Sequence, residues 1–244
     1  MKNTLNLIIL PLYRIENDYS FSIYNCLNNT ESTLSLEWLE KILSKLFYKF
    51  NISQISIEGG EISLLSDIYF DLLFKLLKIY TKKISISTDF INFKQSLIND
   101  VNTINVLYNF NINSDIVYKN IKAATSIQKN INVKSIDYFV NDNYLNKIHI
   151  LNKLKIKSWE IIPYQKTKNN NLEYSKDLYK NTIDNYLKYL DNMQFNFINT
   201  NTKTNIIESI YITPNNKLGL GKLNSNNEFF IEEYDSLDEL EKNL

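Results

Sequence analysis

Apolar residues recur along this chain in two alternating patterns, short continuous runs and longer stretches with helical spacing. The runs at 5–12, 52–57, 84–88, 103–108, 133–140 and 158–163 have the length and composition of buried parallel strands. Between them, apolar residues three and four positions apart predict amphipathic helices. This alternation is typical of a parallel sheet with helices on the outside.

Two of the predicted helices begin at recognisable capping residues. Ser35 precedes the first, and Ser66 or Asp67 precedes the second; such short polar side chains accept hydrogen bonds from the first free amides of a helix. The predicted apolar faces are Leu36, Leu39, Ile42, Leu43, Leu46, Phe47 and Phe50 in the first helix, and Leu72, Leu73, Leu76, Leu77 and Tyr80 in the second. Further helices are predicted at 93–99, 115–128 and 144–154. Six such units are too few for a closed eight-stranded barrel and suit an open doubly wound sheet or a partial barrel.

The pattern changes after Pro163. A polar stretch is followed by a predicted helix at 175–192, by strands at 195–198, 206–213 and 229–234, and by a short capped helix at 236–244. Pro214-Asn215-Asn216 is typical of a turn, and Gly219-Leu220-Gly221 is interpreted as a loop or bulge. We therefore predict two domains, residues 1–166 and an α+β extension at 167–244.

Composition narrows the function classes. Apolar residues make up 44% of the chain, enough for a sizeable core, and 27 basic residues balance 27 acidic ones. No net charge draws the protein to nucleic acid or to an anionic membrane. No apolar run approaches the ~18 residues of a membrane span, and the first run lacks a cleavage site. We expect a soluble, cytoplasmic protein with neither nucleic acid nor membrane as a partner.

Gly59-Gly60-Glu61 directly follows the predicted strand at 52–57, in a chain with only four glycines. One interpretation is a turn that needs a positive φ, or a close approach between strand and loop. The other is that the bare backbone receives the polar end of a ligand, with Glu61 available for a cation. The residues alone leave both open.

The order of these elements resembles the radical S-adenosylmethionine (SAM) superfamily. A first strand, a long loop and a helix precede a strand that ends in Gly-Gly-Glu, and the resemblance covers most of residues 5–165. It implies an α/β fold, a partial (β/α)6 barrel with a small α+β C-terminal extension. It also implies that Gly59, Gly60 and Glu61 hold the amino group of SAM. The segment 210–221 is similar to the C-terminal extension of peptide-modifying members.

The resemblance implies further ligand-binding positions. Thr88 and Asp89 end the third predicted strand, and Asp137 lies in the fifth. Trp159 and Ile161 lie in the sixth, which the family places beside the adenine of SAM. The alternative for each polar residue is a satisfied group at a strand end. Because side chains alternate along a strand, one of Trp159 and Glu160 should point into the barrel.

The cysteines depart from the family pattern. The family carries C-x3-C-x2-C in the loop after the first strand, where three thiolates hold a 4Fe–4S cluster. Here Tyr19 and Ile23 stand at the first two positions, and Cys26, the only cysteine of the chain, stands at the third. We therefore expect no iron–sulfur cluster and no other metal site. His149, the only histidine, is interpreted as a surface or packing residue.

Three hypotheses follow. The first is a degenerate radical-SAM-like protein that acts as a non-catalytic partner, binding a peptide or an active radical SAM homologue in peptide maturation. The second is an enzyme that binds SAM or another nucleotide at Gly59-Gly60-Glu61 and uses it for polar chemistry. The third is a radical enzyme with unusual cluster ligation. The sequence identifies no catalytic residue.

Overall fold

The computed structural model describes residues 4–13, 32–92, 94, 98–108, 110, 114–127, 130–135, 144–162, 176–199, 209–223 and 229–244. These residues form two compact units. The first unit draws on Met1–Ser87 and Thr202–Leu244, and the second on Thr88–Gln165 and Leu172–Asn201. Each unit therefore combines a part of the predicted barrel with a part of the predicted extension; a domain boundary at 166/167 stays a prediction.

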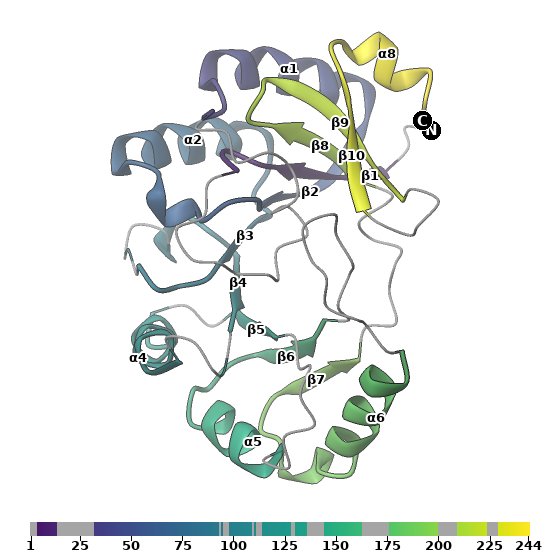
Figure 1. The fold of residues 1–244 in the computed structure, drawn as a ribbon. Coiled ribbons are helices and arrows are strands. Elements are labelled where there is room, and N and C mark those ends of the chain that lie inside the picture. The colour runs from purple at the N-terminus through teal and green to yellow at the C-terminus, as the bar shows by residue number, and fades with distance from the viewer. Residues whose placement is uncertain are drawn as a thin grey trace. The chain divides into compact units, whose positions relative to one another are not determined.

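A mostly parallel sheet forms the centre of the first unit (Figure 1). Its strands follow the order β10-β9-β8-β1-β2-β3. Their bounds are Thr4–Ile9 for β1, Asn51–Ile57 for β2, Ile84–Thr88 for β3, Ser209–Thr213 for β8, Lys217–Leu223 for β9 and Phe229–Tyr234 for β10. β8 pairs in parallel with β1, whereas β9 pairs antiparallel with both β8 and β10. Strands from both ends of the chain thus share one sheet.

Serine side chains begin the helices of the first unit. The helices are α1 (Leu36–Lys49), α2 (Asp67–Tyr80) and α8 (Leu237–Glu241), and η1 (Ile62–Leu64) is a 3-10 turn. The hydroxyls of Ser35, Ser66 and Ser236 each accept a hydrogen bond from the amide three residues later. The predicted caps are therefore confirmed, and Ser66 instead of Asp67 caps α2. A cap of this kind stabilises a helix by about 1 kcal/mol.

The two long helices differ in how well their buried faces were predicted. α1 buries Leu39, Ile42, Leu43 and Leu46, as expected. α2 buries Phe70, Leu73, Phe74 and Leu77. Leu72 lies on the exposed side of α2, so its assignment to the buried face was wrong. The physical reason is that α2 carries apolar residues on both sides, and helical spacing alone does not select between them.

The second unit has a parallel sheet in the order β4-β5-β6-β7. These strands span Thr103–Leu107, Ile131–Ser135, Ser158–Ile161 and Asn196–Asn199, and the helices are α4 (Ser114–Ala124), α5 (Tyr144–Asn152), α6 (Lys176–Leu187) and the 3-10 turn η2 (Leu190–Asn192). β5 begins two residues before its predicted start at Val133. The remainder of that predicted strand lies outside the described residues, and so does most of the helix predicted at 93–99.

Gly219-Leu220-Gly221 corrects another expectation, because these residues lie within β9 and not in a loop. A Cβ at Gly219 would stand 2.3 Å from Cγ2 of Ile231, in the neighbouring strand. The glycine therefore makes room for a side chain of β10. The turn predicted before β9 is confirmed at Pro214-Asn215-Asn216, where Asn216 has a φ of 58° and its amide donates to the Thr213 carbonyl.

Candidate functional site

The turn after β2 depends on Gly59. This residue has a φ of 104°, a conformation that favours glycine. A Cβ there would lie 2.9 Å from the Leu12 carbonyl oxygen and 3.3 Å from the side chain of Leu10. The amide of Gly60 donates to the same Leu12 carbonyl at 2.9 Å. Both needs of the structural interpretation, a positive φ and a close approach, are met at this turn.

Glu61 is buried directly after the two glycines, with 7% of its surface exposed. It is the N-cap of η1, and its Oε1 accepts a hydrogen bond from the amide of Ser63 at 2.9 Å. A carboxylate that accepts a backbone N–H makes a charge-assisted bond, stronger than a neutral one. One carboxylate oxygen of Glu61, a residue predicted to bind SAM, therefore stabilises the turn in which it lies.

Two buried hydroxyls near strand ends were not singled out by the sequence. Ser63 Oγ lies in η1, and Thr213 Oγ1 lies at the carboxyl end of β8. Neither has a hydrogen-bond partner within the described part of the chain. A buried hydroxyl without a partner costs roughly 1–3 kcal/mol, so a group that reached either hydroxyl would recover that energy. No sequence signal separates these two residues from other strand-end hydroxyls.

The ends of the long connection after β1 are held close together. The amide of Leu34 donates to the Pro11 carbonyl at 2.8 Å, and Leu12 forms an antiparallel bridge with Thr33. The Tyr69 hydroxyl donates to the Leu34 carbonyl at 2.7 Å. Burial raises the pKa of Tyr69, so this hydroxyl keeps its proton as a donor. Tyr19, Ile23 and Cys26, the predicted remnant of the cluster motif, lie between these ends and outside the described residues.

In the second unit, Thr88 and Asp89 form a turn with the residues that follow them. Thr88 Oγ1 accepts from the amide of Phe90, and Asp89 Oδ1 accepts from the amide of Ile91, both at 3.0 Å. Phe90 is fully buried and has a φ of 61°, which is unusual for a bulky residue. Asn120 Nδ2 donates to the carbonyls of Phe90 and Ile91 at 2.9 and 3.0 Å. Thr88 and Asp89 therefore have the local role that was the alternative to ligand binding, that of satisfied polar groups at a strand end.

Trp159 is fully buried in an aromatic cluster of the second unit. Its indole N–H donates to Ser135 Oγ at 2.9 Å. Its ring lies 4.6 Å from that of Tyr186 in α6 and 5.5 Å from that of Phe197 in β7, centroid to centroid. Ile161, two residues further along β6, is also fully buried. Packing thus accounts for both residues on the side of the sheet that contacts α6.

The opposite face of this sheet is polar. Asn132 Nδ2 donates to Asn105 Oδ1 at 3.1 Å, and Ser158 Oγ donates to Asn132 Oδ1 at 2.7 Å. One step along the strands, Lys134 and Glu160 form an ion pair at 3.4 Å. Alternation along β6 therefore directs Glu160 away from the α6 side and Trp159 towards it. Asp137, the remaining predicted ligand residue, lies outside the described residues.

A site-differentiated 4Fe–4S cluster does not fit the donor set of this chain. Such a cluster needs three thiolates, and the sequence has one cysteine. Within the described ranges, no group of three or more His, Cys, Asp and Glu side chains is arranged to hold a metal ion. His149 is exposed on α5. The described helices include none long and apolar enough to cross a membrane.

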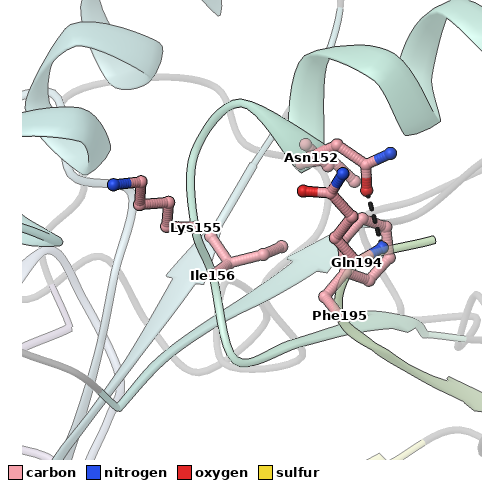
Figure 2. A pocket seen from close by; sticks show the side chains of 6 residues that line it. Asn152, Lys155, Ile156, Gln194 and Phe195 are labelled. Carbon is pink, nitrogen blue, oxygen red and sulfur yellow. Dashed lines mark hydrogen bonds between the residues drawn. The ribbon is translucent and has the colours of Figure 1, made fainter.

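A shallow pocket in the second unit has none of the predicted ligand residues in its lining (Figure 2). It has a volume of about 210 Å³ and is lined by Leu151, Asn152, Lys155, Ile156, Gln194 and Phe195. Asn152 Oδ1 accepts from the amide of Gln194 at 2.9 Å, and the Lys155 side chain points away from this pair. Ligand pockets usually exceed about 300 Å³. We therefore assign no site to this pocket.

Solved structures show the same fold. Streptococcus suis SuiB bound to its precursor peptide SuiA superimposes with a TM-score of 0.74 at 15% identity, over 89% of this chain and 59% of SuiB. SuiB bound to S-adenosylmethionine gives 0.68 at 14% identity, over 89% and 60%. The structure of anSMEcpe with bound AdoMet and the Kp18Cys peptide gives 0.68 at 12% identity, over 89% and 74%.

The chain therefore spans about three fifths of the length of the SuiB chains that it matches. No family model matches the sequence, and no curated protein matches it. SuiB and anSMEcpe are radical SAM peptide-modifying enzymes. At identities of 12–15% the likeness concerns the fold. The chain has the α/β fold of the radical SAM partial-barrel type.

Proposed function

We propose that this chain is a degenerate radical-SAM-like protein that holds no 4Fe–4S cluster of its own and acts as a non-catalytic partner or substrate-binding subunit in peptide maturation. It would act in the cytoplasm, with a peptide or an active radical SAM homologue as its partner. The radical step would then belong to that homologue.

The observation that carries this proposal is that the polar side chains near the strand ends bind the backbone of their own turns. Glu61, Thr88 and Asp89 each accept a hydrogen bond from the backbone amide two residues later. The oxygens that a cofactor site would need at these positions thus stabilise the scaffold itself. Together with the single cysteine, this favours a protein selected for its fold over one selected for SAM cleavage.

The comparisons support the peptide part of the proposal. One similar structure holds the precursor peptide SuiA, and another holds the Kp18Cys peptide. In this chain, β10 is the terminal strand in the order of the first unit's sheet. An extended peptide can add to such an edge through main-chain hydrogen bonds. We place the peptide-binding surface of the proposal at this edge.

Calorimetric titration of aerobically purified protein with SAM tests the loss of the cofactor site. We expect no binding with a Kd below about 100 μM. Gly60→Val is the control variant, because Gly59 is needed for the conformation of the turn. Micromolar binding that Gly60→Val abolishes would contradict the non-catalytic function.

Co-expression with a radical SAM homologue that carries the C-x3-C-x2-C triad tests the partner role. We expect the two proteins to elute together in size-exclusion chromatography. Separate elution at every concentration would contradict the role of a homologue as partner. In that case, binding of a candidate precursor peptide to this chain alone decides whether the substrate-binding role stands.

The second candidate function is SAM or nucleotide binding followed by polar chemistry at Gly59-Gly60-Glu61, with Thr88, Asp89, Asp137, Trp159 and Ile161 as further contacts. The buried hydroxyl of Ser63, which has no partner in the described part of the chain, favours it. A thermal shift with SAM that is lost in Ser63→Ala would support this function, because ligand binding stabilises the native state. Stoichiometric iron after anaerobic reconstitution would instead support a radical enzyme with unusual ligation.

A further inference from the structure

The last strand of the first unit's sheet offers main-chain groups to an added strand. β10 lies at the end of the strand order, with β9 on one side (Figure 1). Residues of an antiparallel pair alternate between those that exchange hydrogen bonds with the partner strand and those that do not. A peptide that adds to β10 can bind only the groups that point away from β9, so the register decides which residues these are.

The turn between β8 and β9 sets this alternation. It is a three-residue loop that closes on Thr213 and Lys217, which form a hydrogen-bonded pair in a loop of this kind. Three residues further along β9, Leu220 therefore directs its amide and carbonyl towards β10, where its partner is Glu232. The residues before and after Glu232 direct their amides and carbonyls away from β9.

These two residues are Ile231 and Glu233, and we call their outward-pointing groups the β10 edge. Their side chains lie on the same face of β10, because they are two positions apart. Ile231 is buried, and Glu233 is half-buried. A strand added antiparallel to β10 would place one of its own side chains directly opposite each of them.

The charges around Glu233 indicate which side chain would suit that position. Glu232 pairs with Lys222. Asp235 pairs with Lys217 at 3.2 Å. Both lysines of β9 are thus engaged by the acids on either side of Glu233. Glu233 itself has no ion pair within the described part of the chain.

The hydrogen bonds that Glu233 accepts come from neutral groups. The Tyr13 hydroxyl donates to its Oε1 at 3.4 Å, and Asn215 Nδ2 donates to the same oxygen at 3.3 Å. Tyr13 is buried, so this carboxylate lies in a partly dry corner. A cation beside a carboxylate makes a hydrogen bond about twice as strong as a neutral donor does.

We propose that the β10 edge binds an extended basic segment of a peptide, antiparallel to β10, with a lysine or arginine opposite Glu233 and an apolar residue opposite Ile231. This inference rests on the proposed peptide-binding function and names the class of peptide. Main-chain hydrogen bonds would supply affinity, and the two side-chain positions would supply selectivity.

A second copy of β10 fits this edge less well. A two-fold pairing centred on Glu232 or on Glu233 would put like charges directly opposite each other, which is destabilising. A pairing centred on Ile231 would leave Glu233 without a cation. The acids of β10 therefore favour a basic peptide over self-association.

A pair of blocked probe peptides tests the charge. The first is Thr-Val-Thr-Lys-Thr-Val-Thr, in which a valine lies two positions from the lysine on both sides. The second has glutamate in place of the lysine. In fluorescence anisotropy we expect wild-type protein to bind the lysine probe about fivefold more tightly.

Substitutions at Glu233 should move this preference. Glu233→Gln should abolish it, and Glu233→Lys should reverse it in favour of the glutamate probe. Glu40→Lys is the matched control, because it makes the same change of charge at an exposed position of α1. It should leave the preference as it is in wild type. Circular dichroism spectra and melting temperatures equal to those of wild type would show that the variants fold.

Backbone methylation of the lysine probe tests the added strand. A methyl group on the lysine nitrogen removes a donor that faces β10, so it should weaken binding at least about tenfold. A methyl group on the nitrogen of the next threonine faces away from β10 and should leave the affinity unchanged. Equal effects of the two methyl groups would overturn the addition of a strand at this edge.

The remaining outcomes separate this inference from the proposed function. Equal binding of the two probes, or a lysine preference that survives Glu233→Lys, would overturn the basic class of peptide and leave peptide binding in place. No binding of either probe at protein concentrations up to about 500 μM would overturn the β10 edge as a peptide site. Co-elution with a radical SAM homologue does not depend on either result.

Discussion

The turns after β2 and after β3 share the same hydrogen-bond pattern and a positive φ, but they use different residues for them. Each follows a parallel strand, and each uses a side-chain oxygen to accept the amide two residues later. Each also contains a residue with positive φ, Gly59 at 104° in the first and Phe90 at 61° in the second. The first turn uses the residue type suited to that conformation, whereas the second uses one of the least suited.

The surroundings explain why. At Gly59, a side chain would meet the backbone oxygen of Leu12, which cannot rotate away. At Phe90, the ring is fully buried, and Asn120 donates to the carbonyls of Phe90 itself and of the next residue, Ile91. Packing and two hydrogen bonds there offset a backbone cost of roughly 1–3 kcal/mol. The conformation of the turn therefore accounts for Gly59 without a ligand. For this reason, the Gly-Gly-Glu segment by itself is weak evidence for a binding site.

The largest effect should come from Gly59→Ala. The new Cβ would stand 2.9 Å from the Leu12 oxygen, at a φ that an alanine rarely adopts. We expect the free energy of unfolding to fall by about 3 kcal/mol. Urea denaturation measures it. A loss below about 1 kcal/mol would mean that the turn adjusts without strain, and the structural account of Gly59 would then fail.

Asn120→Ala should have the next largest effect. It removes both hydrogen bonds to the carbonyls of Phe90 and Ile91 while leaving the strained φ in place. We expect a loss of about 2 kcal/mol in the same denaturation experiment. Lys119→Ala, at the exposed neighbouring position of α4, is the control and should change stability by less than about 0.5 kcal/mol. Equal losses in the two variants would show that Asn120 does not hold the second turn.

The sequence predicted the local parts of this fold well. Ser35, Ser66 and Ser236 were recognisable as caps, because capping depends on residues three positions apart. The face of α2 was predicted in part only, since both of its sides are apolar. β9 was missed because glycines usually weaken strands, and the reason for Gly219 is Ile231 in another strand.

The candidate site was harder to predict for the same reason. Glu61 was correctly located beside the glycine turn, but its bond to the Ser63 amide has no sequence signature of its own. The aromatic neighbours of Trp159 include Phe110, Tyr186 and Phe197, which come from widely separated segments. Spacing along one segment identifies a strand-end residue, but contacts between segments decide whether it faces a ligand or a core.

The smallest effects should distinguish the capping carboxylates of the two turns. Asp89→Asn should cost at most about 0.3 kcal/mol, because the bond to the Ile91 amide is only partly buried and an asparagine side chain also accepts the amide two residues later. Glu61→Gln should cost about 1 kcal/mol, because the charge-assisted bond to the Ser63 amide becomes a neutral one in a buried position. Urea denaturation of both variants beside wild type measures the difference. A larger loss of stability in Asp89→Asn than in Glu61→Gln would contradict this expectation. It would mean that the Asp89 carboxylate has a charge-dependent role besides its bond to the Ile91 amide, and the second turn would become the better candidate for ligand binding.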